Sequence, residues 1–295
     1  MSLLSMHLRS PEFIHILNTV IETQSSVDVA LQSIDYIPVN AGAINNNVHV
    51  VAHCQASNKL AGEKGRWTFH FLAKRFVKNA QLPLDRLEVF HLQKRLASKQ
   101  LAPMPLFLSD DHTLYIEEWV DIPADTPSIS PEKLADTLWR IHSTKVKANP
   151  LNLVQAWQQY LRYLCDDNTT DLSESEKLSL QAEYGAILPQ YNSFQLTHGN
   201  DSVLCHHDLH RAHVSGVGSI CFDWEYAAVS TIYFDLACTI KTNEYSENDA
   251  MRLLQQYAET SGRAFDVLKK CTFEAMFFVN FTNKLWCLLT KDTNG

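Results

Sequence analysis

The sequence predicts an α+β protein, in which a small lobe with an antiparallel sheet and an inserted helix precedes a larger, mostly helical lobe. The first 120 residues hold runs of β-branched and aromatic residues, whereas helical spacing dominates after residue 130. A proline-bearing stretch at 121–130 separates the two regions. We therefore expect domains at 1–120 and 121–295, with a binding cleft where they meet.

The elements of the first lobe follow from local patterns. A helix at 10–24 begins at Ser10, directly before Pro11, which suits the first turn of a helix. The other expected elements are strands at 48–55 and 67–76, a helix within 83–100, and a hairpin over 104–120 with its turn at 109–112.

The second lobe shows helix starts at serine residues. Ser130, Ser173 and Ser246 each stand where an N-cap is expected. The expected helices cover 131–143, 156–167, 173–191 and 246–260. The segments 204–209 and 219–226 read as short apolar strands or loops. The apolar stretch 275–290 contains two asparagines and a lysine, so we expect a buried helix and no membrane span.

Composition narrows the class of function. The chain has 295 residues, with 25 basic and 33 acidic side chains and a net charge of −8. Such a balance repels phosphate backbones, so a nucleic-acid partner is not expected. Seven widely spaced cysteines without a CxxC pair indicate reduced thiols, and no signal peptide is apparent. We expect a cytoplasmic protein; the sequence does not indicate its oligomeric state.

Two aspartates stand out in "LCHHDLHRAHVSGVGSICFDWEYA". Asp208 and Asp223 each follow a short apolar run, which would anchor the backbone while the carboxylate projects from it. Phosphoryl transfer needs two such groups. One carboxylate accepts the proton of the attacking hydroxyl, and the other holds a divalent ion that bridges the nucleotide phosphates.

Other readings of this stretch stay open. His206 and His210 lie four residues apart, as zinc ligands on one helix turn do. The segment reads as a strand end, however, and no glutamate stands between the two histidines, which disfavours a zinc hydrolase. The aspartates could also be ordinary surface or capping residues, and His206 could be structural.

The motifs resemble those of aminoglycoside-phosphotransferase-like and choline kinases. "CHHDLHRAHV" resembles the catalytic loop H-x-D-x-x-x-x-N, "CFDWEYA" the metal-binding segment, and "YFDLA" the D-L-A that follows. The W-E-Y form points to the choline, ethanolamine and thiamine kinase branch. The resemblance is most specific from His206 to Asp235 and implies a bilobal, protein-kinase-like fold.

For the second lobe, the resemblance implies a role for each matching residue. Asp208 would be the catalytic base, and Asp223 would bind Mg²⁺. His206 and Asp235 would order the catalytic loop.

For the first lobe, the resemblance implies an ATP site. "AGAINNNVHVV" has the shape of a nucleotide loop, with Asn45 at a family asparagine. Lys74 in "FLAKRF" would contact the phosphates, with Arg75 as its competitor on the other strand face, and Glu88 would pair with Lys74. The backbone from Glu117 to Trp119 would meet the adenine.

One departure concerns the metal. His213 stands where the family has a metal-binding asparagine, and imidazole nitrogen suits Mn²⁺ and other transition ions better than Mg²⁺. His213 could ligate the ion, the second metal could be dispensable, or the protein could bind nucleotide or amine without turnover, as a pseudokinase does.

We expect the acceptor to be a small, cationic alcohol related to choline, ethanolamine or thiamine. Trp224, Glu225 and Tyr226 are the candidate substrate residues, because aromatic faces and a carboxylate hold a quaternary ammonium or thiazolium group. Each aromatic could instead belong to the core. An aminoglycoside- or homoserine-type phosphotransferase is the alternative within the same family.

Overall fold

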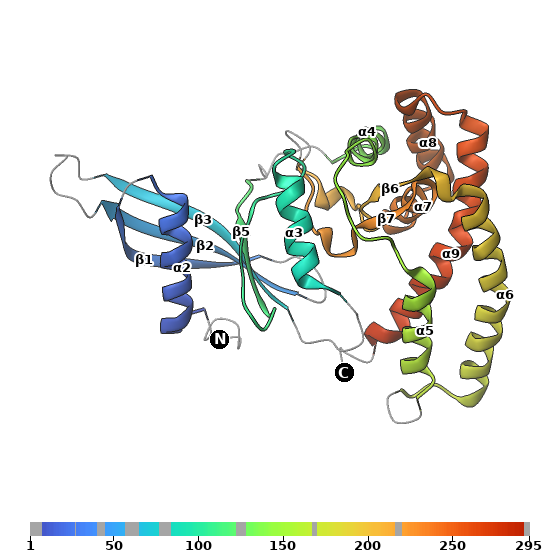
Figure 1. Cartoon of the computed structure of the whole chain (residues 1–295), viewed down its shortest axis with the longest axis horizontal. Helices are drawn as coiled ribbons and strands as arrows, with labels where there is room; N and C mark the ends of the chain where they lie inside the picture. The colour runs from blue at the N-terminus through green and yellow to red at the C-terminus, as the bar shows by residue number, and fades with distance from the viewer. Residues whose placement is uncertain are drawn as a thin grey trace. The chain divides into compact units, whose positions relative to one another are not determined.

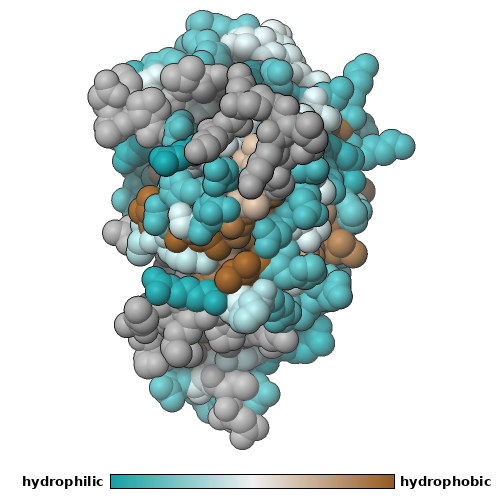
Figure 2. All heavy atoms as spheres, turned by 90° about the vertical axis from the view of Figure 1, so that its left-hand side faces the viewer, coloured by the Kyte–Doolittle hydropathy of each residue, from teal (hydrophilic) through white to brown (hydrophobic). Residues whose placement is uncertain are grey.

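The computed structural model describes residues 8–26, 28–39, 45–56, 65–76, 84–121, 128–166, 170–215 and 220–291 (Figure 1). The chain divides into two compact units. The first covers Met1–Asn79 and Arg86–Asp121, and the second covers Ala80–Asp85 and Ile122–Gly295. In the view of Figure 2 the described surface is mostly hydrophilic, with hydrophobic side chains gathered near its middle.

The first unit is a five-stranded antiparallel sheet in the order β1-β2-β3-β5-β4. Its strands are β1 (Val29–Val39), β2 (Asn45–Ala56), β3 (Arg66–Phe76), β4 (Pro105–Leu108) and β5 (Leu114–Glu118). The pairing confirms the strands expected in the sequence and adds β1, which the sequence patterns did not reveal. A register shift between Leu31 and Ser33 breaks the period-2 alternation of β1, which explains why it escaped detection.

Each face of this sheet is covered differently. Helix α2 (Pro11–Gln24) is capped by Ser10, whose hydroxyl accepts from the Phe13 N–H at 3.2 Å. Its apolar side packs into a core with residues such as Val50 and Phe71, which pair across β2 and β3. Helix α3 (Arg86–Ala97) instead contacts the face that carries Lys74, where Gln93 hydrogen-bonds Glu117 and Tyr115.

The second unit is mostly helical. Its α-helices are α4 (Pro131–His142), α5 (Leu153–Leu164), α6 (Glu174–His198), α7 (Ile232–Thr242), α8 (Glu247–Ser261) and α9 (Phe265–Lys291). The serine caps are confirmed: Ser130, Ser173 and Ser246 each accept a backbone N–H, and Ser173 forms a capping box with Glu176. Among the described residues, none of the helices is both long and apolar enough to cross a membrane.

A two-stranded antiparallel sheet within this unit carries the loop that contains Asp208. Strand β6 (Ser202–Cys205) follows the short helix η2 (Gly199–Asp201) and pairs with β7 (Ala228–Thr231). Between these strands lie the short helices η3 (Arg211–His213) and η4 (Trp224–Tyr226). Helix α7 follows β7 directly; nine of its eleven residues are buried, so it lacks the one-sided apolar pattern that would have predicted it.

Candidate active site

The loop after β6 is held in an unusual backbone conformation. His207 and Asp223 have positive φ angles of 66° and 63°, which cost energy for residues with a side chain. Asp235, in the first turn of α7, accepts the backbone N–H groups of His206 at 2.9 Å and of His207 at 2.7 Å. These two hydrogen bonds fix the chain immediately before Asp208.

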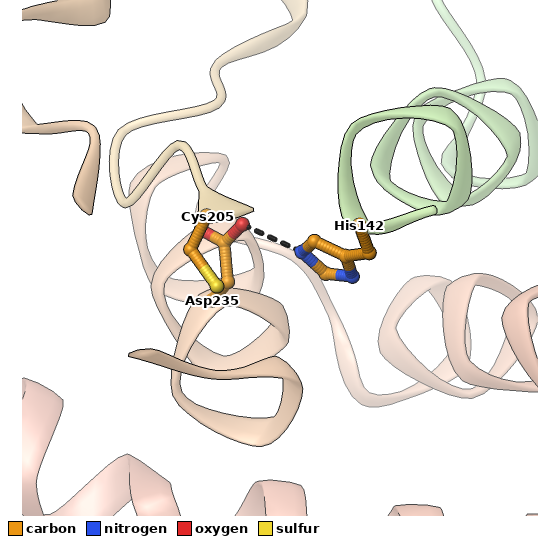
Figure 3. Close-up of side chains that lie close together, drawn as sticks. All are labelled: His142, Cys205 and Asp235. Atoms are coloured by element: carbon orange, nitrogen blue, oxygen red, sulfur yellow. Dashed lines mark hydrogen bonds and ion pairs between the residues drawn. The ribbon is translucent and has the colours of Figure 1, made fainter. Parts of the chain in front are cut away.

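Asp235 is itself part of a buried network (Figure 3). His142, the last residue of α4, lies 2.9 Å from Asp235 through Nε2, and its Nδ1 lies 2.7 Å from the Tyr257 hydroxyl. Burial alone would raise the pKa of Asp235, but the hydrogen bond from His142 and the nearby imidazoles outweigh it and hold that pKa well below its usual range. Asp235 is therefore an ionised acceptor.

His142 and Tyr257 are not among the site residues that the sequence predicted. Cys205 completes a buried cluster with His142 and Asp235, whose donor atoms lie within 4.8 Å of one another. Its thiol, however, hydrogen-bonds the Ser230 carbonyl at 3.3 Å, and the His142 ring has partners at both nitrogens. The cluster therefore supports the loop. The sequence signal that could have revealed it is His142, a histidine on the apolar face of the predicted helix 131–143.

His206 ties the two aspartate segments together. Its Nε2–H donates to the Phe222 carbonyl at 2.9 Å, and its Nδ1 accepts the Asp208 N–H at 3.3 Å. Burial lowers the pKa of His206 to about 4, so the ring is neutral at pH 7. The ring also contacts Trp224, with centroids 4.6 Å apart.

The two aspartates converge with His213. Donor atoms of Asp208, His213 and Asp223 all lie within 4.8 Å of one another. His213 Nε2 is 3.9 Å from an Asp223 carboxylate oxygen, and His213 Nδ1 is 4.0 Å from an Asp208 carboxylate oxygen. These side chains are partly exposed, so an ion can reach them.

The Asp208 carboxylate has a raised pKa. Burial raises that pKa to about 6, with His213 opposing the shift and the charges of Asp223 and Glu225 adding to it. A carboxylate with this pKa is ionised at pH 7 and a better proton acceptor than an ordinary aspartate.

Asp208 also lines a cavity of about 260 Å³ in the second unit. Apolar and aromatic residues form most of its wall, including Tyr160, Tyr226 and Trp286, and Lys241 and Thr242 add polar groups. Burial and the charge of Glu225 raise the pKa of the Tyr226 hydroxyl, and the Trp286 indole opposes this shift. Within the described residues, this hydroxyl makes no hydrogen bond of normal geometry.

The structure places the three expected substrate residues in different surroundings. Trp224 is only 1% exposed, and its indole N–H donates to the Cys221 carbonyl at 2.8 Å, so this side chain is part of the core. Glu225 does not line the cavity but acts on Asp208 through its charge. Of the three expected residues, only Tyr226 lines the cavity; Trp286, from the stretch 275–290 that was expected to form a buried helix, lines it too.

The lysine site of the first unit also differs from expectation. Lys74 Nζ pairs with Glu117 Oε1 at 3.1 Å, whereas the sequence suggested Glu88 as its partner. Glu88 instead accepts a hydrogen bond from Arg95 at 2.8 Å within α3. The link from α3 to the lysine runs through Gln93, whose amide donates to Glu117 at 2.6 Å.

The remaining expected nucleotide residues lie at the ends of strands. Glu117 belongs to β5, and its buried side chain pairs with Lys74; the expected contact of its backbone with adenine stays a prediction. Trp119 follows β5 and stacks on His49, with ring centroids 3.7 Å apart and planes 4° from parallel. Asn45 is the first residue of β2, but its side chain lies outside the described residues, as does the loop before it.

Comparison with known proteins settles the family. Residues 35–271 match the family model of the phosphotransferase enzyme family. The chain belongs to this family. No curated protein sequence matches it.

Solved structures of phosphotransferases share the fold. A choline kinase from Cryptosporidium parvum is 13% identical with a TM-score of 0.65, over 94% of this chain and 89% of that one. An ethanolamine kinase from Plasmodium vivax is 14% identical with a TM-score of 0.62, over 97% and 85%. The streptomycin–ATP–APH(2")-IIa complex is 11% identical with a TM-score of 0.54, over 89% and 86%. The kinase-like fold expected from the sequence is thereby confirmed.

Proposed function

We propose that this phosphotransferase moves the γ-phosphoryl group of ATP to the hydroxyl of a small alcohol. The observation that carries the proposal is the convergence of Asp208, His213 and Asp223 on a loop fixed by Asp235. The acceptor oxygen forms the new bond to phosphorus while the bond to the ADP oxygen breaks. Asp208 takes the hydroxyl proton, and its pKa of about 6 suits that role.

We assign the divalent ion to Asp223. The donor set of partly exposed oxygen and nitrogen atoms within 4.8 Å fits such an ion. When bound, Mg²⁺ or Mn²⁺ neutralises phosphate charge. The αL conformation of Asp223 and the backbone bond from the Phe222 N–H to the His213 carbonyl, at 2.8 Å, hold the carboxylate beside His213.

Lys74 contacts the nucleotide phosphates in this proposal. Its ammonium group is positioned by Glu117, which in turn is held by Gln93, and Gln93 accepts from the Tyr115 hydroxyl at 2.6 Å. A fixed lysine neutralises phosphate charge without first reorganising. Support for ATP as the donor comes from the family relative whose complex contains ATP.

The acceptor belongs in the cavity beside Asp208. At about 260 Å³ the cavity is smaller than most drug-sized sites, which favours a compact choline-, ethanolamine- or thiamine-like alcohol over a multi-ring aminoglycoside. The faces of Tyr160, Tyr226 and Trp286 suit a cationic head group. Because all seven cysteines are free thiols, a cytoplasmic location fits the proposal.

A coupled assay of ADP release tests this function. The panel is choline, ethanolamine, thiamine, homoserine and an aminoglycoside, each with Mg²⁺ and then Mn²⁺. At least one small alcohol should stimulate ADP release, and Asp208→Asn should reduce kcat by about 10²- to 10⁴-fold. Asp266→Asn, at an exposed position in α9, is the matched control. Absence of turnover with every acceptor, or full activity in Asp208→Asn, overturns the proposal and favours a binding protein.

A further inference from the structure

The imidazole of His213 is oriented by the backbone beside it. Nδ1 lies 2.9 Å from the carbonyl oxygen of Asp208, and a carbonyl can only accept a hydrogen bond. In the neutral ring the proton is therefore on Nδ1, which leaves a lone pair on Nε2. Histidines that ligate metal ions are commonly fixed in this way by a carbonyl at the other nitrogen.

Nε2 faces the carboxylate of Asp223 across a gap. The separation of 3.9 Å is too long for a hydrogen bond. Two ligands each about 2.1 Å from one ion are themselves about 3–4 Å apart. The gap between Nε2 and the carboxylate oxygen therefore matches the space between two ligands of a common ion.

The backbone around His213 is fixed on both sides. The His213 N–H donates to the His210 carbonyl at 2.8 Å, and the His213 carbonyl accepts the Phe222 N–H at 2.8 Å. Val214 forms a bridge with Cys221, which joins the same two segments. The imidazole and the Asp223 carboxylate are therefore set against each other by the backbone before any ion binds.

We propose that His213 is a nitrogen ligand, through Nε2, of the divalent ion that Asp223 holds, and that the site selects a transition ion such as Mn²⁺ over Mg²⁺ even without nucleotide. This inference rests on the proposed function for the place of the ion but not on turnover. Mg²⁺ prefers oxygen ligands, whereas imidazole strengthens the binding of Mn²⁺ and later first-row ions.

The test measures ion binding by the full chain without nucleotide. Mn²⁺ titration followed by EPR gives the affinity, Mg²⁺ competition gives the selectivity, and pulsed EPR detects directly coordinated ¹⁴N. Wild type should show the nitrogen coupling. His213→Asn should lose that coupling, and its Mn²⁺ affinity should fall by about tenfold or more relative to its Mg²⁺ affinity. His213→Gln repeats the test should the first variant not fold.

Control variants separate this role from loop structure. His210→Asn changes a histidine of the same loop, whose ring centroid is 5.8 Å from that of His213, and should keep the nitrogen coupling. Asp223→Asn should abolish tight Mn²⁺ binding. Mn²⁺ bound to wild type without nitrogen coupling, or an unchanged Mn²⁺-to-Mg²⁺ ratio in His213→Asn, overturns the inference. Either result leaves the proposed function standing, because that depends on ADP release.

Discussion

Lys74 and Glu117 form an ion pair of 3.1 Å between neighbouring strands, with 10% and 2% of their side chains exposed. The second Glu117 oxygen accepts from Gln93 of α3, at 2.6 Å. The lysine of β3 is thus positioned mainly from β5, and α3 acts on it through an amide. A charged pair this deeply buried depends on both partners, because removing one takes away the opposite charge that offsets the burial of the other.

Glu117→Gln should destabilise the protein strongly. The substitution leaves the Lys74 charge buried, and we expect a loss of about 3 kcal/mol in the free energy of unfolding. Urea denaturation measures the loss, and nucleotide affinity should fall with it because the lysine is no longer held. Glu118→Gln, at the exposed neighbouring position, should change stability by less than about 0.5 kcal/mol. Equal effects of the two substitutions would refute this role of Glu117.

Sequence patterns located the main chemical groups of the second unit but not all their partners. Asp208 and Asp223 were identified because apolar runs precede them in ordered motifs, and the structure brings them together. The resemblance to kinases indicated Glu88 as the lysine partner, because sequence alone gives no measure of which carboxylate faces Lys74. The alternation of Tyr115 and Glu117 in β5, two residues apart on the face of Lys74, was the signal that was overlooked.

Glu225→Gln should shift the acid limb of the pH–rate profile to lower pH. Asp208 must be ionised to accept a proton, so kcat/KM should fall as pH drops through about 6. Burial is the main cause of the raised pKa, and the Glu225 charge contributes to it. Removing that charge lowers the pKa of Asp208, so more enzyme stays active at pH 5. Glu274→Gln, at an exposed position of α9, should leave the profile unchanged. A shift of the acid limb to higher pH in Glu225→Gln would contradict the assignment of Asp208 as the base.

Tyr257→Phe should weaken the buried His142–Asp235 network that fixes the loop before Asp208. The substitution removes the hydroxyl that lies 2.7 Å from His142 Nδ1 and leaves a buried acceptor unsatisfied. We expect a loss of about 1–2 kcal/mol in the free energy of unfolding. Tyr184→Phe removes a hydroxyl whose hydrogen bond to Gln158 is exposed, and should cost less than about 0.5 kcal/mol. Thermal or urea unfolding of both variants decides whether the network contributes as described.

The buried imidazole of His206 should make stability depend on pH below neutrality. The His206 ring binds a proton near pH 6.5 in the unfolded chain but only near pH 4 in the folded protein. As pH falls, protons therefore bind the unfolded state first and lower the free energy of unfolding. About 3 kcal/mol of unfolding free energy should be lost from this group between pH 7 and pH 4, with no loss above pH 7. His206→Gln should flatten that dependence, whereas His15→Gln, at an exposed position, should not. Urea unfolding at several pH values measures both; parallel curves for wild type and His206→Gln would exclude this origin.

Lys241 tests the charge of the acceptor. It lies at the exposed end of α7 and lines the cavity that contains Asp208 and the aromatic side chains. A cationic acceptor is repelled by its ammonium group, so Lys241→Ala should lower KM for a choline-like alcohol by about two- to fivefold, with kcat little changed. An uncharged alcohol should not respond, and neither should Lys269→Ala, an exposed lysine of α9 outside the cavity lining. Steady-state kinetics at low and high salt measures the effect, which should shrink as salt screens the charge. A rise in KM in Lys241→Ala would show that the lysine attracts the acceptor, and the cationic class would then be wrong.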